Sequence, residues 1–449
     1  MSEIIALLAC FEQCLPGTTQ RQMALVISGM LRMPGRVTML GIARWTDKGG
    51  SYRTVQRFFH TVIPWGELFW LLFKRYVLRS EDEYIVAGDE SVLTKAGKKT
   101  YGIDRFFSSI YGKPVPGLAL FALSLINVNQ GSSTPILVEQ IIKSKTEEPK
   151  AKPKPKKKEK PSQEKRKPGR PKGSKNKDKT LVERTPELNR IDGMLEKVLT
   201  RLGGHMTIRH LVMDGHFGNN NALQMVRTRG LHLVSKLRHD AALHFQYDGE
   251  QKPTGANKRY GDKIDYQNIP SRYLLSSKTK KQIRTDIYQS TMLHKAFAGL
   301  LNVVIIVKVN LKTQQQAHVI LFSSDPDLAA EKLIRYYQLR FQIEFNFRDA
   351  KQFWGLEDFM VVEERAVTNA MNLSLFMVSL SQILLFDFRQ GSPQAGILDL
   401  KAYYRGRFYA SHTLQLLPQK PEPILFQPIF DSIARLGAIH RSFYPLQPT

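Results

Sequence analysis

The amino-acid sequence predicts an α/β protein with a helical N-terminal region and a β-rich segment late in the chain. Short apolar runs of strand-like composition begin at residue 84, and a helical pattern separates the third run from the fourth. Short β runs dominate residues 220–330. Because 449 residues exceed what one hydrophobic core usually holds, we expect roughly two to four domains.

The first 80 residues are predicted to be helical. One amphipathic pattern covers residues 3–14 and a second covers residues 20–32. Thr18 or Thr19 is the expected N-cap of the second helix, because a threonine hydroxyl can accept a hydrogen bond from the first turn.

A helix-turn-helix pattern follows within this region. Residues 37–46 and 51–60 are the two predicted helices, the turn between them reads DKGG, and Ser51 is the expected N-cap of the second helix. Arg53 and Arg57 lie one turn apart on that second helix. Such a helix pair can read DNA, although ordinary helical hairpins show the same pattern. Both arginines are therefore candidate DNA-binding residues.

Residues 81–219 show the alternating order of an α/β core. The predicted elements are strands over 84–87, 118–128 and 135–142, a helix over 186–202 and a strand over 207–213. Asp89 follows the first of these strands, and Asp214 follows the last. The carboxyl ends of strands are where α/β folds place their chemistry, although aspartate after a strand is also an ordinary turn residue.

A segment of different composition interrupts this core at residues 143–182. Residues 143–180 contain 17 Lys and Arg against 5 Asp and Glu, and they include a single aliphatic residue. Such a segment cannot bury enough apolar surface to offset the entropy lost on ordering. We therefore expect it to be disordered.

Within this segment the sequence RKPGRPK resembles an AT-hook, whose Gly-Arg-Pro core lies in the narrow minor groove of A·T-rich DNA. Its candidate DNA-binding residues are Arg166, Gly169, Arg170 and Pro171. The alternative is a basic linker that raises DNA affinity through counterion release alone.

The β-rich segment spans residues 220–325. Its predicted strands cover 231–237, 242–247, 283–290, 302–309 and 316–322. The sequence Asp325-Pro326-Asp327 indicates a helix start, because proline suits the first helical position and acidic residues favour the first turn.

A stripe of polar residues lies on the helix predicted next. Tyr337, Arg340, Glu344 and Lys351 stand at offsets of 0, 3, 7 and 14 residues, within an arc of roughly 60° on one helix face. A carboxylate binds metal ions and the two cations bind phosphate, so the stripe suits chemistry on a nucleic-acid backbone. The alternative is a solvated amphipathic face.

The aromatic residues of this helix argue against the solvated alternative. They are Phe341, Phe345, Phe347, Phe353 and Trp354. They leave little of the helix polar, so we expect it to be buried on most sides. Gly355 marks the expected end of the helix.

The charge favours a polyanionic partner. A formal net charge of +26 fits nucleic acid or an anionic membrane surface. The best membrane candidate, residues 370–388, is interrupted by polar side chains and is expected to be a buried core helix, so we expect double-stranded DNA and no membrane. Cys10 and Cys14 cannot complete a four-ligand zinc site, and the N-terminus lacks the basic start of a secretory signal. A cytoplasmic, nucleoid-associated location is expected.

These blocks together resemble a known family. Asp89 in IVAGDES, Asp214 in LVMDGHFGN and Glu344 in the Y-x2-R-x3-E-x6-K block look like the three catalytic acids of a DDE transposase. The sequence is most similar to transposases of bacterial insertion sequences, in the large family (number four in the usual classification) that this block defines. The resemblance covers about residues 20–385.

The resemblance implies a domain organisation. Residues 81–219 and 326–390 would form a ribonuclease-H-like catalytic core, and residues 220–325 a β-rich insertion domain. Residues 1–80 would be a helical domain that binds transposon ends. Residues 391–449 form a C-terminal region with no assigned role.

The resemblance also implies roles for the site residues. Asp89, Asp214 and Glu344 would be catalytic and would hold two Mg²⁺ or Mn²⁺ ions, because adjacent carboxylates repel one another unless cations neutralise them. Asp89 would contact both ions. The other residues of the stripe would bind DNA phosphates beside the bond that is cut, and they are Tyr337, Arg340 and Lys351.

The leading hypothesis is a transposase that binds the terminal inverted repeats of an insertion sequence, cleaves the ends and transfers the 3′-hydroxyl strands to target DNA. A homodimer is expected, because two ends must be brought together. One alternative is a ribonuclease-H-like nuclease without strand transfer. Another is a catalytically silent, transposase-derived protein that binds A·T-rich DNA.

One feature departs from relatives that make hairpin-ended intermediates. Those proteins use aromatic residues, notably tryptophan in the inserted domain, to receive a flipped base. All four tryptophans of this chain lie outside residues 214–344. The sequence therefore assigns no residue to that role.

Overall fold

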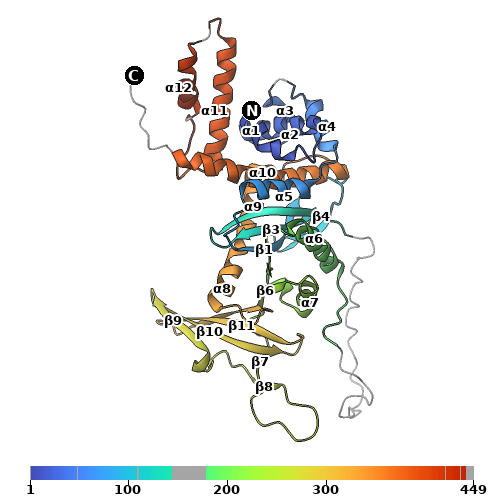
Figure 1. Cartoon of the computed structure of the whole chain (residues 1–449), viewed down its shortest axis with the longest axis vertical. Helices are drawn as coiled ribbons and strands as arrows, with labels where there is room; N and C mark the ends of the chain where they lie inside the picture. Colours follow the sequence, from blue (N-terminus) through green and yellow to red (C-terminus); the bar gives the residue numbers. More distant parts are fainter. Residues whose placement is uncertain are drawn as a thin grey trace.

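A mixed sheet of twelve strands runs through the described part of the protein, with helices gathered around its upper half (Figure 1). The computed structural model describes residues 2–47, 49–108, 111–143, 178–419, 421–434 and 436–440. The four AT-hook candidates, Arg166, Gly169, Arg170 and Pro171, lie outside these residues, as does most of the predicted basic segment.

The N-terminal region is helical, as the sequence predicts. Its elements are α1 (Ser2–Leu8), η1 (Ala9–Phe11), α2 (Gly17–Arg32), α3 (Met39–Arg44), α4 (Tyr52–His60) and α5 (Trp65–Tyr76). Ser51 caps α4 by accepting a hydrogen bond from the Thr54 amide, which confirms the predicted cap. The predicted cap of α2 is wrong. Pro16 precedes this helix in an extended conformation, and Thr19 lies inside the first turn with its side chain buried.

The half of the sheet formed by β1 to β6 is consistent with a ribonuclease-H-like core. Its strands are β1 (Tyr84–Thr94), β2 (Asp104–Ser108), β3 (Lys113–Asn127), β4 (Ser132–Ile141), β5 (His210–Val212) and β6 (His232–Leu237). β4, β3 and β1 pair antiparallel, whereas β1, β5 and β6 pair parallel. Helix α6 (Pro186–Leu202) lies between β4 and β5 in the chain and has the bounds that the sequence predicts, and helix α7 (Asn220–Thr228) connects β5 to β6.

Strand β1 is longer than predicted. It continues past Ala87 to Thr94, because β3 pairs with it along its whole length, from Tyr84 opposite Asn127 to Thr94 opposite Gly117. Asp89 therefore lies within a strand and does not follow one. With respect to β5, however, Asp89 does lie beyond the paired residues, since that pairing ends at Ala87.

The insertion continues the same sheet. Its strands are β7 (Leu243–Gln246), β8 (Tyr260–Lys263), β9 (Leu274–Lys280), β10 (Ile283–His294), β11 (Leu300–Asn310) and β12 (Gln316–Ser323). β12 pairs antiparallel with β6, from Ile320 opposite Leu237 to Ser323 opposite Val234. The sequence analysis missed β2, β8 and β9. β8 and β9 are largely exposed and lack the alternating apolar pattern of a half-buried strand.

Five helices complete the described chain: α8 (Ala330–Leu339), α9 (Phe341–Phe353), α10 (Glu364–Gly391), α11 (Ile397–Leu416) and α12 (Pro423–Ala434). The helix start predicted at residues 325–327 is wrong. The Asp325 carboxylate accepts hydrogen bonds from His210 and from the Asp327 amide, which hold these residues in a turn before α8 begins at Ala330. Gly355, with φ of +75°, follows α9 and its C-cap Trp354, as predicted.

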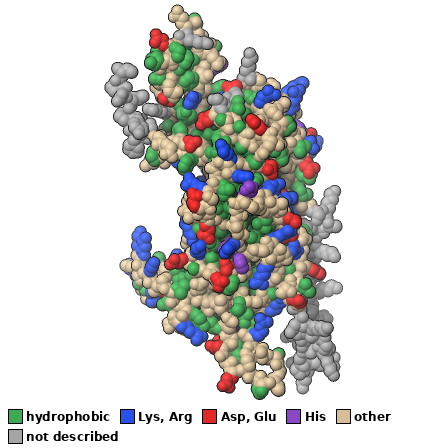
Figure 2. All heavy atoms as spheres, in the orientation of Figure 1, with side chains coloured by type: hydrophobic (Ala, Val, Ile, Leu, Met, Phe, Trp, Pro, Cys, Tyr) green, Lys and Arg blue, Asp and Glu red, His purple; other side chains and the backbone are tan. Residues whose placement is uncertain are grey.

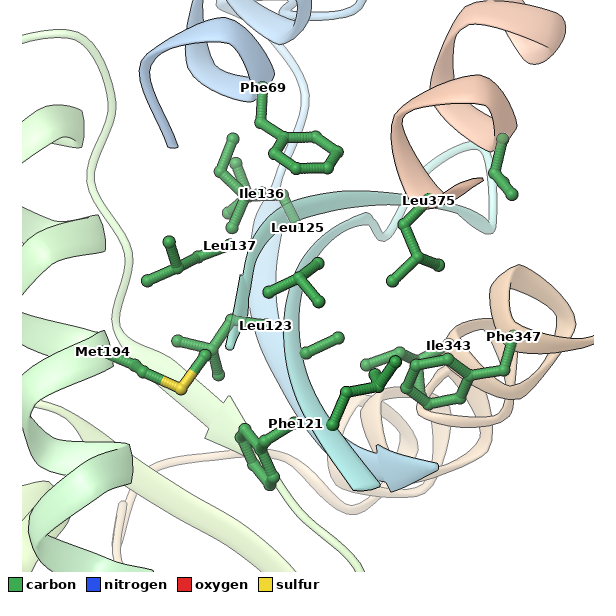
Figure 3. Packing of buried hydrophobic residues seen from close by; sticks show 14 of the residues in the cluster. Phe69, Phe121, Leu123, Leu125, Ile136, Leu137, Met194, Ile343, Phe347 and Leu375 are labelled. Atoms are coloured by element: carbon green, nitrogen blue, oxygen red, sulfur yellow. The ribbon is translucent and has the colours of Figure 1, made fainter. Parts of the chain in front are cut away.

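One hydrophobic core joins the N-terminal helices to the catalytic sheet. Figure 3 shows Leu123 and Leu125 of β3 among side chains from surrounding helices, including Phe69 of α5, Leu375 of α10 and Phe347 of α9. The N-terminal helices are therefore packed as part of the catalytic body. By length and composition α10 alone among the described helices could cross a membrane, and 72% of its most apolar window is buried in the protein. The predicted buried helix over residues 370–388 is confirmed.

Candidate active site

Strand register brings Asp89 and Asp214 to the same end of two parallel neighbours. Ala87 on β1 pairs with Val212 on β5. Each aspartate follows two residues later, so both carboxylates lie just past the paired part of their strands. Because parallel strands run in the same direction, the two acids come together although 125 residues separate them in sequence.

Asp89 is mostly enclosed. Its Oδ1 accepts a hydrogen bond from the Glu90 amide at 2.9 Å, and its Oδ2 lies 2.8 Å from Nη1 of Arg340. Burial raises the pKa of the Asp89 carboxyl above its ordinary value, and the charges of Asp214 and Glu344 act in the same direction. The guanidinium of Arg340 opposes this shift. Asp89 is therefore within electrostatic reach of both other candidate acids.

Asp214 begins the short turn of 3₁₀ helix η3 (Gly215–Phe217). Its side chain caps this turn by accepting a hydrogen bond from the His216 amide at 3.1 Å. Its backbone carbonyl accepts a hydrogen bond from the hydroxyl of Ser235 on β6 at 2.6 Å. Ser235 is fully buried, so this bond fixes the chain at Asp214. The His216 ring lies 3.4 Å from the Glu187 carboxylate of α6.

Arg340 stands at the junction of α8 and α9. The sequence predicts one helix across this point, but α8 ends at Leu339 and α9 begins at Phe341. The Arg340 guanidinium lies 2.8 Å from Asp89 and 2.8 Å from Glu344. Its side chain is only 9% exposed, and its Nε is buried without a hydrogen-bond partner. Arg340 thus holds the acid of β1 and the acid of α9 together.

Glu344 lies in the first turn of α9, and its side chain is 40% exposed. Buried polar contacts fix this helix against the sheet. Asn346, two residues later, donates hydrogen bonds to the hydroxyls of Ser133 on β4 at 2.8 Å and Ser124 on β3 at 3.4 Å. The sequence predicts no role for Asn346 or Ser235. The one feature that distinguishes them is that each is a small polar residue within an apolar strand or helix face.

Tyr337 lies one turn before Arg340 on α8. Burial raises the pKa of its hydroxyl, the charges of Asp214 and Asp89 raise it further, and Arg340 lowers it. This phenol therefore lies near the acids, as the stripe predicts.

Lys351 lies farther along the stripe and does not contact the acids. Its ammonium donates a hydrogen bond to the carbonyl of Val92 on β1 at 3.0 Å and lies 3.2 Å from the Glu357 carboxylate. Of the four stripe residues, Arg340 and Glu344 are in direct contact.

The prediction that this helix is buried on most sides is wrong for two residues. Phe341 is 53% exposed and Phe345 is 42% exposed, whereas Ile343 and Phe347 face the core. Residues 341 and 345 lie one turn apart, on the side of α9 turned away from the sheet. The Phe341 ring lies beside the site, with its centre 5.4 Å from the guanidinium carbon of Arg340, whereas the Phe345 ring lies against Arg348.

The three candidate acids offer carboxylate oxygens as possible metal ligands. Within the described ranges, no three His, Cys, Asp or Glu side chains lie close enough together to hold a metal ion. The Arg340 guanidinium instead supplies positive charge between Asp89 and Glu344. Carboxylate oxygens are the ligands that Mg²⁺ and Mn²⁺ prefer. The chemistry of the acids suits such an ion, but their arrangement, with Arg340 between Asp89 and Glu344, forms no three-ligand site among the described residues.

The candidate DNA-reading residues of the N-terminal region are accessible. Arg53 and Arg57 both lie on the exposed side of α4, and Val55, Phe58 and Phe59 face inward. By contrast, Lys95, which follows β1, is half-buried. Its ammonium binds the carbonyls of Glu357 and Phe359, and burial lowers the pKa of this lysine to about 8.

Asp89 of β1 and Asp214 just after β5 lie at the same end of parallel strands, and Arg340 joins Asp89 to Glu344 of α9. Clustered carboxylates of this kind occur in sites that cut phosphodiester bonds with divalent ions. A family model described as a DDE superfamily endonuclease matches residues 10–295, and the chain belongs to this family. Membership supports a transposase or nuclease function, and endonucleases of this type generally use divalent metals. The matched segment contains Asp89 and Asp214 and ends before Glu344. No curated protein matches the chain.

Proposed function

We propose that this endonuclease is a DNA transposase of the insertion-sequence type defined by the Y-x2-R-x3-E-x6-K block. It would bind terminal inverted repeats, cleave the ends and transfer the 3′-hydroxyl strands to target DNA, acting as a homodimer. The observation that carries the proposal is the register of Ala87 with Val212, which aligns Asp89 with Asp214, together with the contact of Arg340 to Asp89 and Glu344.

The three carboxylates would hold Mg²⁺ or Mn²⁺. When bound, such ions activate a water or a 3′-hydroxyl and stabilise the oxygen that leaves phosphorus. The Ser235 hydroxyl keeps the Asp214 backbone in place, and Asn346 keeps α9 against β3 and β4. These contacts hold the carboxylates before DNA arrives, so little reorganisation is needed during the reaction.

Arg340 and Tyr337 are the proposed phosphate-binding residues. A guanidinium can bind two phosphate oxygens in the same planar geometry with which Arg340 now binds two carboxylates. Lys351 is the third proposed phosphate contact, and to reach DNA its ammonium must leave Glu357. Exposed Phe341 and Phe345 add flat apolar surface on which a displaced base can stack.

The proposal is tested by Mg²⁺-dependent cleavage of DNA that carries the terminal repeats. Asp89→Ala, Asp214→Ala and Glu344→Ala should each reduce the cleavage rate by on the order of 10³-fold or more and leave end binding intact. Glu90→Ala is the matched control, because Glu90 adjoins Asp89 but lies near Glu187 and Arg190 of α6. Equal cleavage by the parent and all three triad variants would refute the assignment.

Strand transfer separates the transposase from a nuclease of the same fold. Pre-cut ends incubated with target DNA should yield joined products, whereas a nuclease without strand transfer would yield none. Binding of A·T-rich DNA without cleavage, in Mg²⁺ and in Mn²⁺, would instead favour a catalytically silent DNA-binding protein.

A further inference from the structure

Two amide side chains of the insertion bind the turn that leads into α8. Asn302 of β11 is 2% exposed, and its Nδ2 donates hydrogen bonds to the carbonyls of Asp325 at 3.0 Å and Leu328 at 2.7 Å. Gln289 of β10 donates to the same Leu328 carbonyl at 3.0 Å and to Oδ1 of Asn302 at 2.8 Å. We call Asn302 and Gln289 the amide pair. Both amide groups use their donors on the turn or within the pair, as buried amides must.

The amide pair also caps α8. Ala329 occupies the N-cap position of this helix and has no polar side chain. Oε1 of Gln289 instead accepts a hydrogen bond from the Ala330 amide at 3.2 Å. The first amides of a helix have no partner inside the helix, so an acceptor at this point stabilises the first turn. A strand of the insertion therefore supplies the cap that the sequence of α8 does not provide.

The core contacts α8 and the turn before it through side chains. The Tyr336 hydroxyl and the Lys332 ammonium both donate hydrogen bonds to the carboxylate of Glu83, which precedes β1. The Asp325 carboxylate lies 2.9 Å from the ring of His210 on β5. Such bonds can persist while the side chains rotate, whereas the amide pair binds main-chain atoms of the turn and of the first helical residue. The amide pair therefore restricts the backbone at the start of α8.

The other side of α8 faces solvent. Glu331, Arg335 and Gln338 are exposed, whereas Leu333 and Tyr336 are buried. Figure 2 shows a hollow on the side of the molecule where α8 runs between the insertion and the helices drawn above it in Figure 1. The position of α8 therefore depends on contacts made from its buried side, and the amide pair makes these contacts at the helix start.

Two residues of the polar stripe lie at the far end of α8. Tyr337 is in its last turn, and Arg340 follows Ala330 by ten residues, which span about 15 Å of helix. A helix transmits a displacement of its first turn along its axis, so a shift at Ala330 moves Arg340 relative to Asp89 and Glu344. Misplacing a group in an active site by about 1 Å can lower a rate by on the order of 100-fold.

We propose that Asn302 and Gln289 are positioning residues of the cleavage reaction. They fix the start of α8 and thereby hold Tyr337 and Arg340 in place beside the acids. This inference rests on the proposed function. It gives the insertion a part in the chemistry, although the three candidate acids all lie outside it.

The first test compares cleavage with binding in Asn302→Leu and Asn302→Asp, which keep a side chain of similar size and remove the donated hydrogen bonds. Under saturating end DNA and Mg²⁺, the single-turnover cleavage rate should fall roughly tenfold in both, and the dissociation constant for end DNA should stay within about twofold of the parent's. Gln316→Ala is the matched control, because Gln316 of β12 donates to the Tyr266 carbonyl at 2.8 Å and this bond stays within the insertion. Its cleavage rate should equal that of the parent.

The pH dependence of Asn302→Asp separates positioning from a general loss of structure. An ionised carboxyl at this position donates no hydrogen bond, but a protonated one can donate to the Leu328 carbonyl again. Burial raises the pKa of such a carboxyl, so it should become protonated between about pH 8 and pH 6. The cleavage rate of Asn302→Asp, divided by that of the parent at each pH, should therefore rise as the pH falls. The same ratio for Asn302→Leu should stay constant.

Hydrogen exchange of the DNA-free protein tests the structural step without catalysis. Backbone amides of residues 329–340 should exchange roughly tenfold faster in Asn302→Leu than in the parent, because the start of α8 is no longer held. Amides of residues 316–323 should exchange at the parent's rate, and so should α8 in Gln316→Ala. Gln289→Met removes the cap on Ala330 and should have the same effect on α8 as Asn302→Leu.

Three outcomes would overturn the proposal: exchange of α8 that is unchanged in Asn302→Leu, faster exchange with an unchanged cleavage rate, or an equal loss of rate in Gln316→Ala. A parent that does not cleave end DNA would refute the proposed function and, with it, the catalytic role of the amide pair. The proposed function stands if the parent cleaves and the variants cleave as fast, so the two failures are distinguishable.

Discussion

The guanidinium of Arg340 binds Asp89 and Glu344 at the same time, at 2.8 Å from an oxygen of each carboxylate. It balances the charge of two of the three acids without a metal ion. A divalent cation and Arg340 cannot both satisfy the same carboxylate oxygens, so the arginine would compete with the proposed metal ion. A phosphate group would draw Arg340 away from the acids, and metal binding would then follow DNA binding.

Removing this competitor should strengthen metal binding by the DNA-free protein. We expect Arg340→Ala to lower the Mn²⁺ dissociation constant by roughly 10- to 100-fold, which corresponds to the loss of charge-assisted hydrogen bonds that otherwise oppose the ion. Electron paramagnetic resonance of free Mn²⁺, titrated with protein, measures this directly. Arg348→Ala is the control, since Arg348 pairs with Asp349 away from the acids. A gain in affinity that persists in Arg340→Ala/Glu344→Ala would place the metal elsewhere.

Ser235 should position Asp214 without touching the substrate. Ser235→Ala removes the hydrogen bond to the Asp214 carbonyl, and we expect the cleavage rate to fall roughly tenfold, with a stability loss of about 1–2 kcal/mol. Cleavage kinetics and urea unfolding measure the two effects. Ser235→Thr retains the hydroxyl and should recover part of the rate. An unchanged rate in Ser235→Ala would show that η3 holds Asp214 without this bond.

Asn369 should stabilise the junction between the N-terminal helices and α10. Its side chain accepts a hydrogen bond from the Trp65 indole and donates to the carbonyls of Phe59 and Thr61, all at 2.8 Å. Asn369→Ala leaves these buried groups unpaired, and we expect a loss of about 2–4 kcal/mol of unfolding free energy in urea titrations.

The matched control for this junction is Asn372→Ala. Asn372 is also buried in α10, but its amide donates to the Thr368 carbonyl of the same helix. Asn372→Ala should lower the free energy of unfolding by less than about 1 kcal/mol. Equal losses of unfolding free energy in the two variants would mean that both substitutions weaken α10 itself. The hydrogen bonds across the junction would then add no further stability.

Asp192 should make stability depend on pH below about 4. Hydrogen bonds from Arg229 and the charges of Arg184 and Arg229 outweigh burial and lower the pKa of the Asp192 carboxyl below its ordinary value of 3.8. A carboxyl whose pKa is lower in the folded state stabilises the protein at pH values above its unfolded-state pKa. This stabilisation is lost as the pH falls through the folded-state pKa. Asp192→Asn should lower the free energy of unfolding by about 1–3 kcal/mol at pH 7.

This cost should shrink as pH falls below about 4, because the parent aspartate becomes protonated as well. Urea unfolding of parent and variant at several pH values measures the difference and cancels the acid effects common to both. Glu196→Gln is the control, since Glu196 also pairs with Arg229 but its side chain is 62% exposed. A cost for Asp192→Asn that is independent of pH would contradict the linkage.

The elements that the sequence predicts well are those specified by local patterns. The helix over residues 186–202 has the predicted bounds because Thr185 caps it, Pro186 suits its first position and the apolar period is regular. The sequence indicates Asp89 and Asp214 as candidate site residues because a short apolar run precedes each of them. The local sequence does not predict how far β1 extends. Its length depends on pairing with β3, whose residues lie about 30 positions later in the chain.

The features of the site that the sequence does not predict depend on how helices and strands pack against one another in the folded protein. Nothing in the local pattern tells that Phe341 faces solvent and Phe347 faces the sheet, because both positions are phenylalanine on an aromatic-rich helix. The pairing of Lys351 with Glu357 requires the turn at Gly355, which brings the chain back past α9. The role of Ser235 likewise appears only when β6 lies beside the end of β5.

The pairing of β12 with β6 has a consequence for any attempt to simplify this protein. Removing residues 238–323 would delete β12 and leave the backbone amides and carbonyls of β6 without partners along one side. An unprotected edge strand is a template for pairing with other chains, so the shortened core would be prone to aggregate. The insertion thus shields the catalytic sheet, and a soluble minimal core would need β12 or a substitute strand in its place.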